Sequence, residues 1–449
     1  MNLFYRCISM VALTFAVFGH CRAEDAIVSK KSIDSINAVE LHLSNGMTVC
    51  IKQTNDEADA VYFKLAAMGG FASLDGKDRP SGEIAMQAAW ESGMGGMTSD
   101  QVSVFLYEHS LEFEPSVKLF SRVIAAEGTS EGIESILQCV KMMFTQQQFT
   151  QAGWTEALKE AKTTLNKYAH DSEYVYETAY LKLNTQDLPL LRSISPEDLK
   201  YTDFETSKGF YRRCFSDPKE FVCVFVGNFN VDKVTALVEQ YLGSIPKATQ
   251  GSGLNRPMIA PFPSGITQSA IHLGDKKAGS VTRLTFPLKI GINEKSLLEI
   301  AFACQIIEAR LRKVITEKMN LSYGVDVSYE FPLYPLLSNP WISIRYRCDA
   351  ETTQPLKEIV VHELAHLQSQ GVSIAEIQAI KKLESGSQDF WMRDNFYWMS
   401  MLTNYYFWGW NPELVDYKNT SMQQLTPEKI DRVLKELFSL SNYSMFTAN

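Results

Sequence analysis

The chain has 449 residues, and its 43 Lys and Arg against 52 Asp and Glu give a formal net charge of −9 at pH 7. This acidic balance argues against nucleic acids and anionic membranes as partners. A chain of this length exceeds what one hydrophobic core usually serves, so two domains of roughly 200 residues are expected.

The first 23 residues have the character of a secretory signal peptide. Arg6 gives a basic start, residues 7–19 form a short apolar run, and the small residue Ala23 precedes Glu24. This order is typical of a cleaved leader. We therefore expect an exported protein, periplasmic or secreted. No later run is long and apolar enough to span a bilayer, so no integral membrane segment is expected.

The stretch from Val39 to Met97 predicts strand, turn, strand, strand and helix. Apolar residues alternate with polar ones on both sides of Asn45-Gly46, which is the strongest short-range signal for a β-hairpin. A third strand ends at Gly69-Gly70. The segment 83–92 is expected to be helical, and Gly93 ends it.

The rest of the chain predicts an α+β fold with two similar domains, each a mostly antiparallel sheet packed by helices. Residues 24–246 form the first domain and residues 268–449 the second. The segment 247–267 is rich in Pro, Gly, Ser and Thr, which marks a linker. Because the second half repeats the first in outline, we expect a cleft between like halves, where a substrate would lie.

This layout resembles the pitrilysin/insulinase family of zinc peptidases, whose members begin with a Leu-x-Asn-Gly hairpin, a Gly-Gly after the third strand and a metal-bearing helix. In active members that helix carries His-x-x-Glu-His, where the imidazoles bind zinc and the carboxylate acts as general base. Here residues 85–90 read Ala-Met-Gln-Ala-Ala-Trp, and none of them binds zinc well. The short motifs Ser92-Gly93-Met94-Gly95 and Phe144-Thr145 are similar to sequences in the family's non-catalytic half.

The resemblance implies a non-catalytic subunit that holds a peptide substrate and pairs with a zinc-bearing pitrilysin-like subunit, or with a second copy of itself. In that reading the zinc lies in the partner, and none is expected in this chain. A third possibility is a structural or chaperone-like assembly subunit, because one fold can serve assemblies that cut nothing.

One motif favours an autonomous zinc metallopeptidase instead. His362-Glu363-Leu364-Ala365-His366 fits the zincin consensus, with two histidines one helical turn apart and Glu363 as the candidate general base. Glu384 is the only downstream carboxylate at a usable distance for a third zinc ligand. Helical spacing opposes this reading, because it places both histidines on the polar flank of one apolar stripe. That stripe is formed by Leu356, Val360, Leu364 and Leu367.

Tyr323 is the candidate substrate-binding residue. It resembles a family tyrosine that holds the substrate backbone together with an arginine seven residues earlier, a position that is Thr316 here. Arg310 and Arg312 lie nearby but are displaced along the helix. The alternative is that Tyr323 simply fills a strand.

Two other features call for structural explanations. The aromatic run 390–410 is expected to pack at the junction of the two domains, in preference to facing lipid.

Six cysteines follow the leader without Cys-x-x-Cys spacing and mostly within apolar runs, so buried free thiols are expected. An acylated Cys21 would make a lipoprotein, but His20 is too large for the position before such a cysteine.

Overall fold

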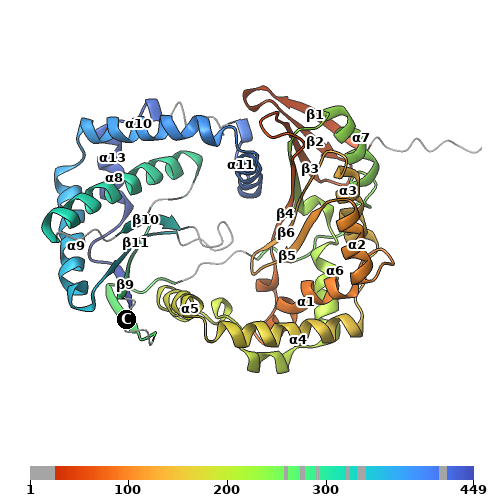
Figure 1. The fold of residues 1–449 in the computed structure, drawn as a ribbon, viewed down its shortest axis with the longest axis horizontal. Helices are drawn as coiled ribbons and strands as arrows, with labels where there is room; N and C mark the ends of the chain where they lie inside the picture. Colours follow the sequence, from red (N-terminus) through yellow and green to blue (C-terminus); the bar gives the residue numbers. More distant parts are fainter. Residues whose placement is uncertain are drawn as a thin grey trace, which may run out of the picture.

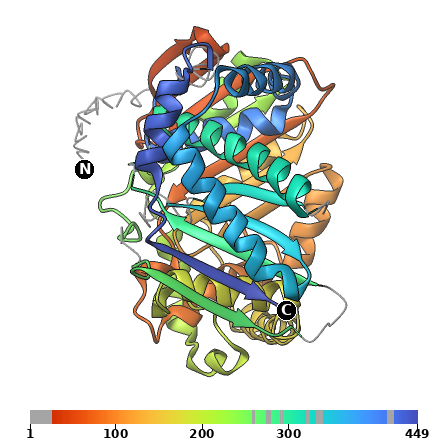
Figure 2. The same cartoon turned by 90° about the vertical axis from the view of Figure 1, so that its left-hand side faces the viewer.

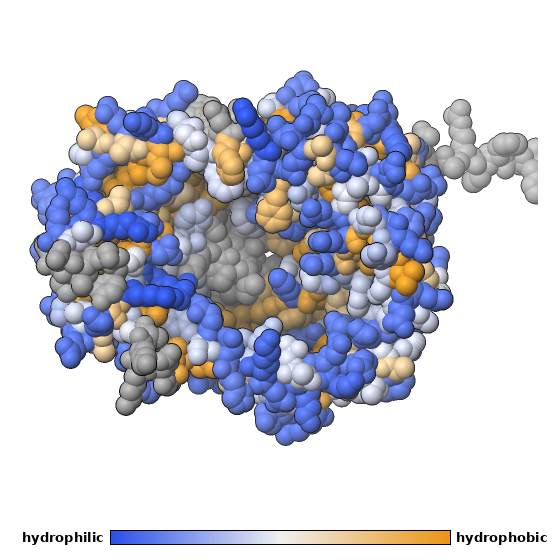
Figure 3. Space-filling model, in the orientation of Figure 1, coloured by the Kyte–Doolittle hydropathy of each residue, from blue (hydrophilic) through white to orange (hydrophobic). Residues whose placement is uncertain are grey.

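The structure is a computed structural model that describes residues 26–256, 261–273, 279–289, 291, 293–319, 324–330, 340–413 and 422–449. These residues form two halves that face each other around a hollow, which Figures 1 and 3 show. Each half is a mostly antiparallel sheet with helices on its outer side. The predicted α+β class is therefore confirmed.

The first half holds a seven-stranded sheet in the order β1-β2-β3-β7-β4-β6-β5. β3 and β7 run parallel, and the other neighbouring pairs are antiparallel. The edge strand β1 was not predicted. The strands are β1 (Ile27–Ile33), β2 (Ala38–Leu43), β3 (Thr48–Gln53), β4 (Val61–Met68), β5 (Glu112–Val117), β6 (Ser121–Gly128) and β7 (Phe221–Gly227).

Seven α-helices belong to the first half, and local signals in the sequence explain several of their ends. Thr98 and Gln101 form a capping box at the start of α2. Gly93 follows α1 with a φ of +81°, a conformation that favours glycine. The helices are α1 (Arg79–Ser92), α2 (Ser99–Glu108), α3 (Ile133–Thr145), α4 (Gln151–Tyr168), α5 (Ser172–Asn184), α6 (Phe204–Cys214) and α7 (Val231–Tyr241).

The second half holds a five-stranded sheet in the order β10-β11-β9-β12-β8. Its strands are β8 (Ile266–Ile271), β9 (Ser280–Pro287), β10 (Val325–Glu330), β11 (Trp341–Cys348) and β12 (Tyr443–Ala448). Its helices are α8 (Glu294–Met319), α9 (Thr353–Gln370), α10 (Ile374–Trp391), α11 (Asn395–Trp408) and α13 (Pro427–Leu437). Two differences from the sequence analysis stand out: β8 begins inside the segment 247–267, and the final strand β12 was not predicted.

The two sheets share one topology. The order β8-β12-β9-β11-β10 matches β3-β7-β4-β6-β5, and the parallel pair β8 and β12 matches β3 and β7. Consequently α8 corresponds in chain order to α1, and α9 corresponds to α3. Figure 2 shows α8 and α9 lying over the outer face of the second sheet.

Each half sends one helix to the inner face of the other half's sheet (Figure 1). From the first half, α5 buries Tyr176 and Tyr180 against Trp341 and Phe446 of the second sheet. The Tyr180 hydroxyl also lies 2.9 Å from the Ser343 hydroxyl. From the second half, α11 packs on β4 and β7. The α11 side chains buried in this contact are Trp398, Met399, Leu402 and Tyr405.

The aromatic run 390–410 is thus placed at the junction of the halves, but only in part. Trp398 and Trp410 are buried there, whereas Phe390 and Phe396 are exposed. No helix of the described residues is long and apolar enough to cross a membrane. The six cysteines of these residues are free and buried, as expected.

The start of the linker is fixed to the first half by a buried arginine. Arg122 is fully buried and donates to the Cys214 carbonyl at 2.8 Å and to the Glu220 carboxylate at 2.6 Å. The same carboxylate accepts hydrogen bonds from the backbone and the hydroxyl of Ser252. A Cβ on Gly69 would lie 2.4 Å from the backbone of Leu254, which explains the glycine after the third strand.

A second arginine joins three helices of the second half. Arg310 of α8 donates to Glu376 of α10 at 2.9 Å and to the carbonyl of Gly371, which follows α9. The hydrogen bonds from Arg310, opposed by partial burial, lower the pKa of Glu376 to about 2. Glu376 also accepts hydrogen bonds from the backbone and the hydroxyl of Ser373, which form a capping box at the start of α10.

We expect Leu402→Ala to destabilise the fold by about 2 to 5 kcal/mol, because Leu402 is fully buried where α11 meets the first sheet. The free energy of unfolding in urea measures this change. Phe396→Ala on the same helix removes an exposed ring and should cost less than about 0.5 kcal/mol. Equal losses in the two variants would contradict the packing of α11 described above.

Replacing Glu376 by Gln should cost about 1 to 2 kcal/mol at pH 7, after allowance for the partial exposure of the carboxylate. The folded-state pKa lies below the ordinary value, so this stability is present above about pH 4.5 and is lost as the pH falls toward 2. Urea unfolding at pH 7 and pH 3 should show the two proteins converging at low pH. Glu317→Gln, which removes one partner of an exposed ion pair on α8, is the control.

Candidate functional site

The helix that matches the family's metal-bearing helix is α1, and its face toward the sheet is apolar. Ala85, Ala88 and Ala89 are buried, with at most 2% of each exposed. These side chains contain no atom that can bind a metal. The residues present therefore do not fit a zinc site at this position.

Gln87 lies between the alanines of α1, and its hydrogen bonds were not predicted from sequence. Its amide donates to Glu91 at 2.9 Å and to Glu160 of α4 at 2.8 Å. Burial and the nearby charge of Glu160 raise the pKa of Glu91. The cluster joins α1 to α4 through hydrogen bonds.

The second half has a matching contact. Gln305 of α8 donates to Glu384 of α10 at 2.6 Å. Glu384 is buried, with 8% of the residue exposed. Because α8 and α10 correspond to α1 and α4, both halves use a glutamine and a glutamate to join the same pair of helices. This contact gives Glu384 a structural role.

The zincin-like motif lies on α9, the counterpart of α3 and not of α1. The four residues of its apolar stripe are buried as predicted, and His362 and His366 are exposed. Glu363 points toward Arg310, with 3.7 Å between their charged groups, and lies 3.9 Å from Nδ1 of His366. The Arg310 cluster that joins α8, α9 and α10 therefore accounts for Glu363.

Nothing in the described part of the chain completes a metal site around these histidines. Within residues 26–449, apart from the gaps given above, no three His, Cys, Asp or Glu side chains are placed to hold a metal ion. Glu384, the candidate third ligand, is bound to Gln305 of α8. The structure brings Glu363 and His366 together but does not add Glu384 to them.

Tyr323 lies outside the described residues, just before the edge strand β10. The two arginines considered as its companions have other partners. Arg310 binds Glu376, and Arg312 pairs with Glu308 at 2.9 Å. Both arginines are therefore held by carboxylates of the second half.

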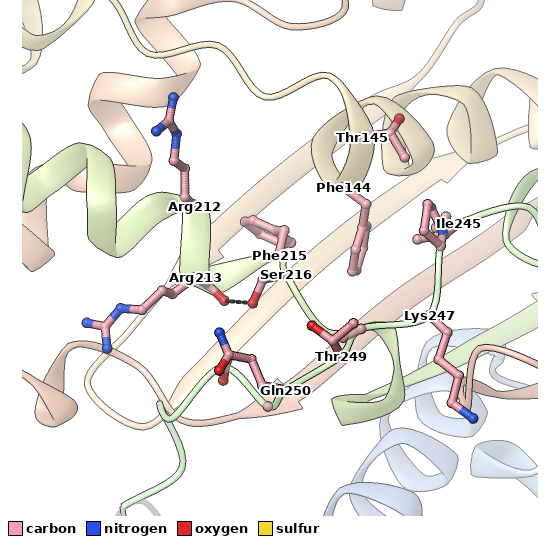
Figure 4. A pocket seen from close by; sticks show the side chains of 14 residues that line it. Phe144, Thr145, Arg212, Arg213, Phe215, Ser216, Ile245, Lys247, Thr249 and Gln250 are labelled. Carbon is pink, nitrogen blue, oxygen red and sulfur yellow. Dashed lines mark hydrogen bonds between the residues drawn. The ribbon is translucent and has the colours of Figure 1, made fainter.

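One concavity lies where the linker leaves the first half. It has a volume of about 770 Å³ and lies between the ends of α3 and α6 and residues 245–252. Figure 4 shows Phe144 and Phe215 at its wall, whereas Arg212, Arg213 and Lys247 extend away from it. The three cations do not converge, so this groove offers no evident binding chemistry.

A smaller pocket of about 330 Å³ lies in the inner wall of the first half, between β4, β7, the end of α11 and the linker. No local sequence pattern predicts this pocket, because its residues come from segments far apart in the chain. Its lining residues include Ala66, Met68, Val222, Tyr406 and Phe407.

Comparison with known proteins gives consistent results. Residues 203–384 match the family model described as the Peptidase M16 inactive domain. A "Zinc protease PQQL-like" protein of Arabidopsis thaliana is 26% identical over 83% of this chain and 38% of its own length. The "Probable zinc protease PqqL" of Escherichia coli (strain K12) is 21% identical over 92% of this chain and 44% of its own length. The chain thus spans less than half the length of these curated relatives.

Solved structures share the fold over nearly the whole chain. The periplasmic protease PqqL from Escherichia coli gives a TM-score of 0.78 at 16% identity, covering 100% of this chain and 49% of that one. A peptidase M16 inactive domain from Pseudomonas fluorescens gives 0.73 at 16% identity, covering 92% and 98%. The ferredoxin protease FusC, solved in complex with an Arabidopsis ferredoxin, gives 0.74 at 14% identity, covering 94% and 46%.

The repeated fold, the metal-free α1 and these matches agree with one another. The chain is similar to the pitrilysin/insulinase family of zinc peptidases over most of its length, and it resembles the non-catalytic half of that family.

Proposed function

We propose that this protein is an exported, non-catalytic subunit that holds peptide substrates and pairs with a zinc-bearing subunit of the same family. The observation that carries the proposal is α1, where buried alanines occupy the place of the family's zinc ligands. The partner would supply the zinc and the general base. This chain would supply part of the chamber wall.

Three further observations support the proposal. The two halves enclose a hollow that a second subunit could close (Figure 3). The matched relatives are named zinc proteases, and each is more than twice as long as the part that this chain matches. One neighbour in structure is titled a ferredoxin protease, so a polypeptide is a reasonable substrate class. Export is supported by the leader-like residues 1–23 and by the periplasmic location given for the Escherichia coli structure.

Two alternatives remain distinct from this proposal. An autonomous zinc peptidase would use His362, Glu363 and His366, and the contact between Glu363 and His366 is the observation in its favour. A homodimer or a purely structural assembly subunit would keep the hollow without a catalytic partner. Zinc content and peptidase activity of the purified chain separate the autonomous peptidase from the other cases, and complex formation with a zinc-bearing relative separates the proposed subunit from a homodimer or a structural subunit.

The purified chain alone should not hydrolyse unfolded peptides and should not contain stoichiometric zinc. A fluorogenic casein assay and elemental analysis measure the two properties. His366→Ala should leave both unchanged, because the imidazole is exposed and no third ligand joins it in the described residues. Chelator-sensitive cleavage that disappears in His366→Ala would favour the autonomous peptidase instead.

Tyr323→Phe should weaken peptide binding by on the order of 1 kcal/mol, because one hydrogen bond from the phenol would be lost. Fluorescence anisotropy with a labelled unfolded peptide gives the affinity, and circular dichroism shows whether the fold is kept. Normal binding by Tyr323→Phe, together with unfolding of Tyr323→Ala, would make Tyr323 a packing residue.

A further inference from the structure

The pocket of about 330 Å³ in the inner wall has an apolar floor. Ala66 of β4 and Val222 of β7 pair across the two strands and belong to the face that α11 partly covers. Met68, Tyr406 and Phe407 complete the apolar walls. Its volume lies at the lower end of the range for small-molecule pockets, and one large side chain would fit there.

The polar groups at this pocket are mostly occupied by other residues. The Tyr406 hydroxyl donates to Glu40 at 2.5 Å, so the tyrosine offers its ring to the pocket. Glu220 is bound by Arg122 and Ser252. The acidic group that lines the pocket is therefore already neutralised.

Lysines without acidic partners surround the same site. Lys219 lines the pocket. Lys64 lies two residues before Ala66 on β4, so its side chain leaves the same face of the sheet about 7 Å away. Among the ion pairs of the described residues, none includes Lys64, Lys118 or Lys219. Burial and the nearby Lys118 also lower the pKa of Lys64.

In a chain with a net charge of −9, unpaired lysines beside an apolar pocket favour an anionic group in the ligand. We propose that this pocket is a specificity subsite that takes a large apolar side chain of the bound peptide, with Lys219 and Lys64 holding a carboxylate next to it. The proposal rests on the peptide-holding function above and adds the chemistry of the preferred sequence. The carboxylate could belong to an Asp or Glu side chain or to the peptide's C-terminus.

The test uses the full chain and labelled host peptides of Gly, Ser and Gln with one guest position. A Phe guest should bind about tenfold more tightly than a Gly guest, which corresponds to burying one large apolar side chain. Asp beside the Phe should bind several-fold more tightly than Asn, and salt should reduce this difference. Peptides ending in Phe, with a free or an amidated C-terminus, show which carboxylate is preferred.

Two variants make the test specific. Ala66→Leu fills the pocket and should abolish the preference for Phe. Ala125→Leu adds the same bulk beside Lys64 on β6, outside the pocket lining, and should preserve that preference. Lys219→Gln should remove the preference for Asp while keeping the preference for Phe. Urea unfolding shows whether each variant is folded. If Ala66→Leu does not fold, the preference of the wild-type protein for a Phe guest over a Gly guest tests the pocket by itself.

The outcomes separate this inference from the proposed function. Binding of all host peptides with no preference for Phe, or equal losses in Ala66→Leu and Ala125→Leu, would overturn the subsite and leave peptide holding intact. The absence of binding to every host peptide would contradict the peptide-holding function itself, and the subsite with it.

Discussion

The exchange of α5 and α11 between the two sheets is the contact on which the arrangement of this protein depends. Each helix covers part of the inner face of a sheet to which it does not belong in sequence. Charged side chains accompany the aromatic ones. Arg283 lies 4.1 Å from the Tyr180 ring and pairs with Glu177, and the Lys52 ammonium lies 4.0 Å above the Trp398 ring. Such partly buried cations fix the helices at defined positions.

The exchange also decides what the hollow presents to a ligand. Because α11 covers only part of the first sheet, short side chains such as Ala66 and Val222 form a recess beyond its end. Among the described residues, the outer helices offer no comparable binding site. Glu363 of α9 is paired with Arg310, and α1 places alanines against the core. The inner wall is therefore the part of the described chain that best suits a peptide.

Local patterns predicted much of the fold. The starts of α4 and α5 follow from local sequence, since both helices have clear capping residues, Thr150 and Asp171. The strands β1 and β12 were missed. β12 lies between β8 and β9, so its place depends on partners far away in the chain. Burial of the α9 stripe was predictable because its apolar residues recur at helical spacing.

The functional site could be predicted from sequence only where the type of residue alone shows whether a metal can bind. Alanines in place of His-x-x-Glu-His exclude the family's zinc site without any structure. The hydrogen bonds from Gln87 to Glu160 and from Gln305 to Glu384 join helices far apart in sequence, and no local pattern predicts them. The role of Glu363 likewise depends on Arg310, which lies on another helix.

In the proposed function this chain contributes half of a two-part peptidase. The most direct measurement is native mass spectrometry of the protein mixed with a zinc-bearing relative from the same organism, followed by a peptidase assay on the isolated species. We expect a one-to-one complex that contains zinc and cleaves peptides, while each separate chain is much less active. A zinc-bearing relative that remains separate and is fully active alone would contradict it.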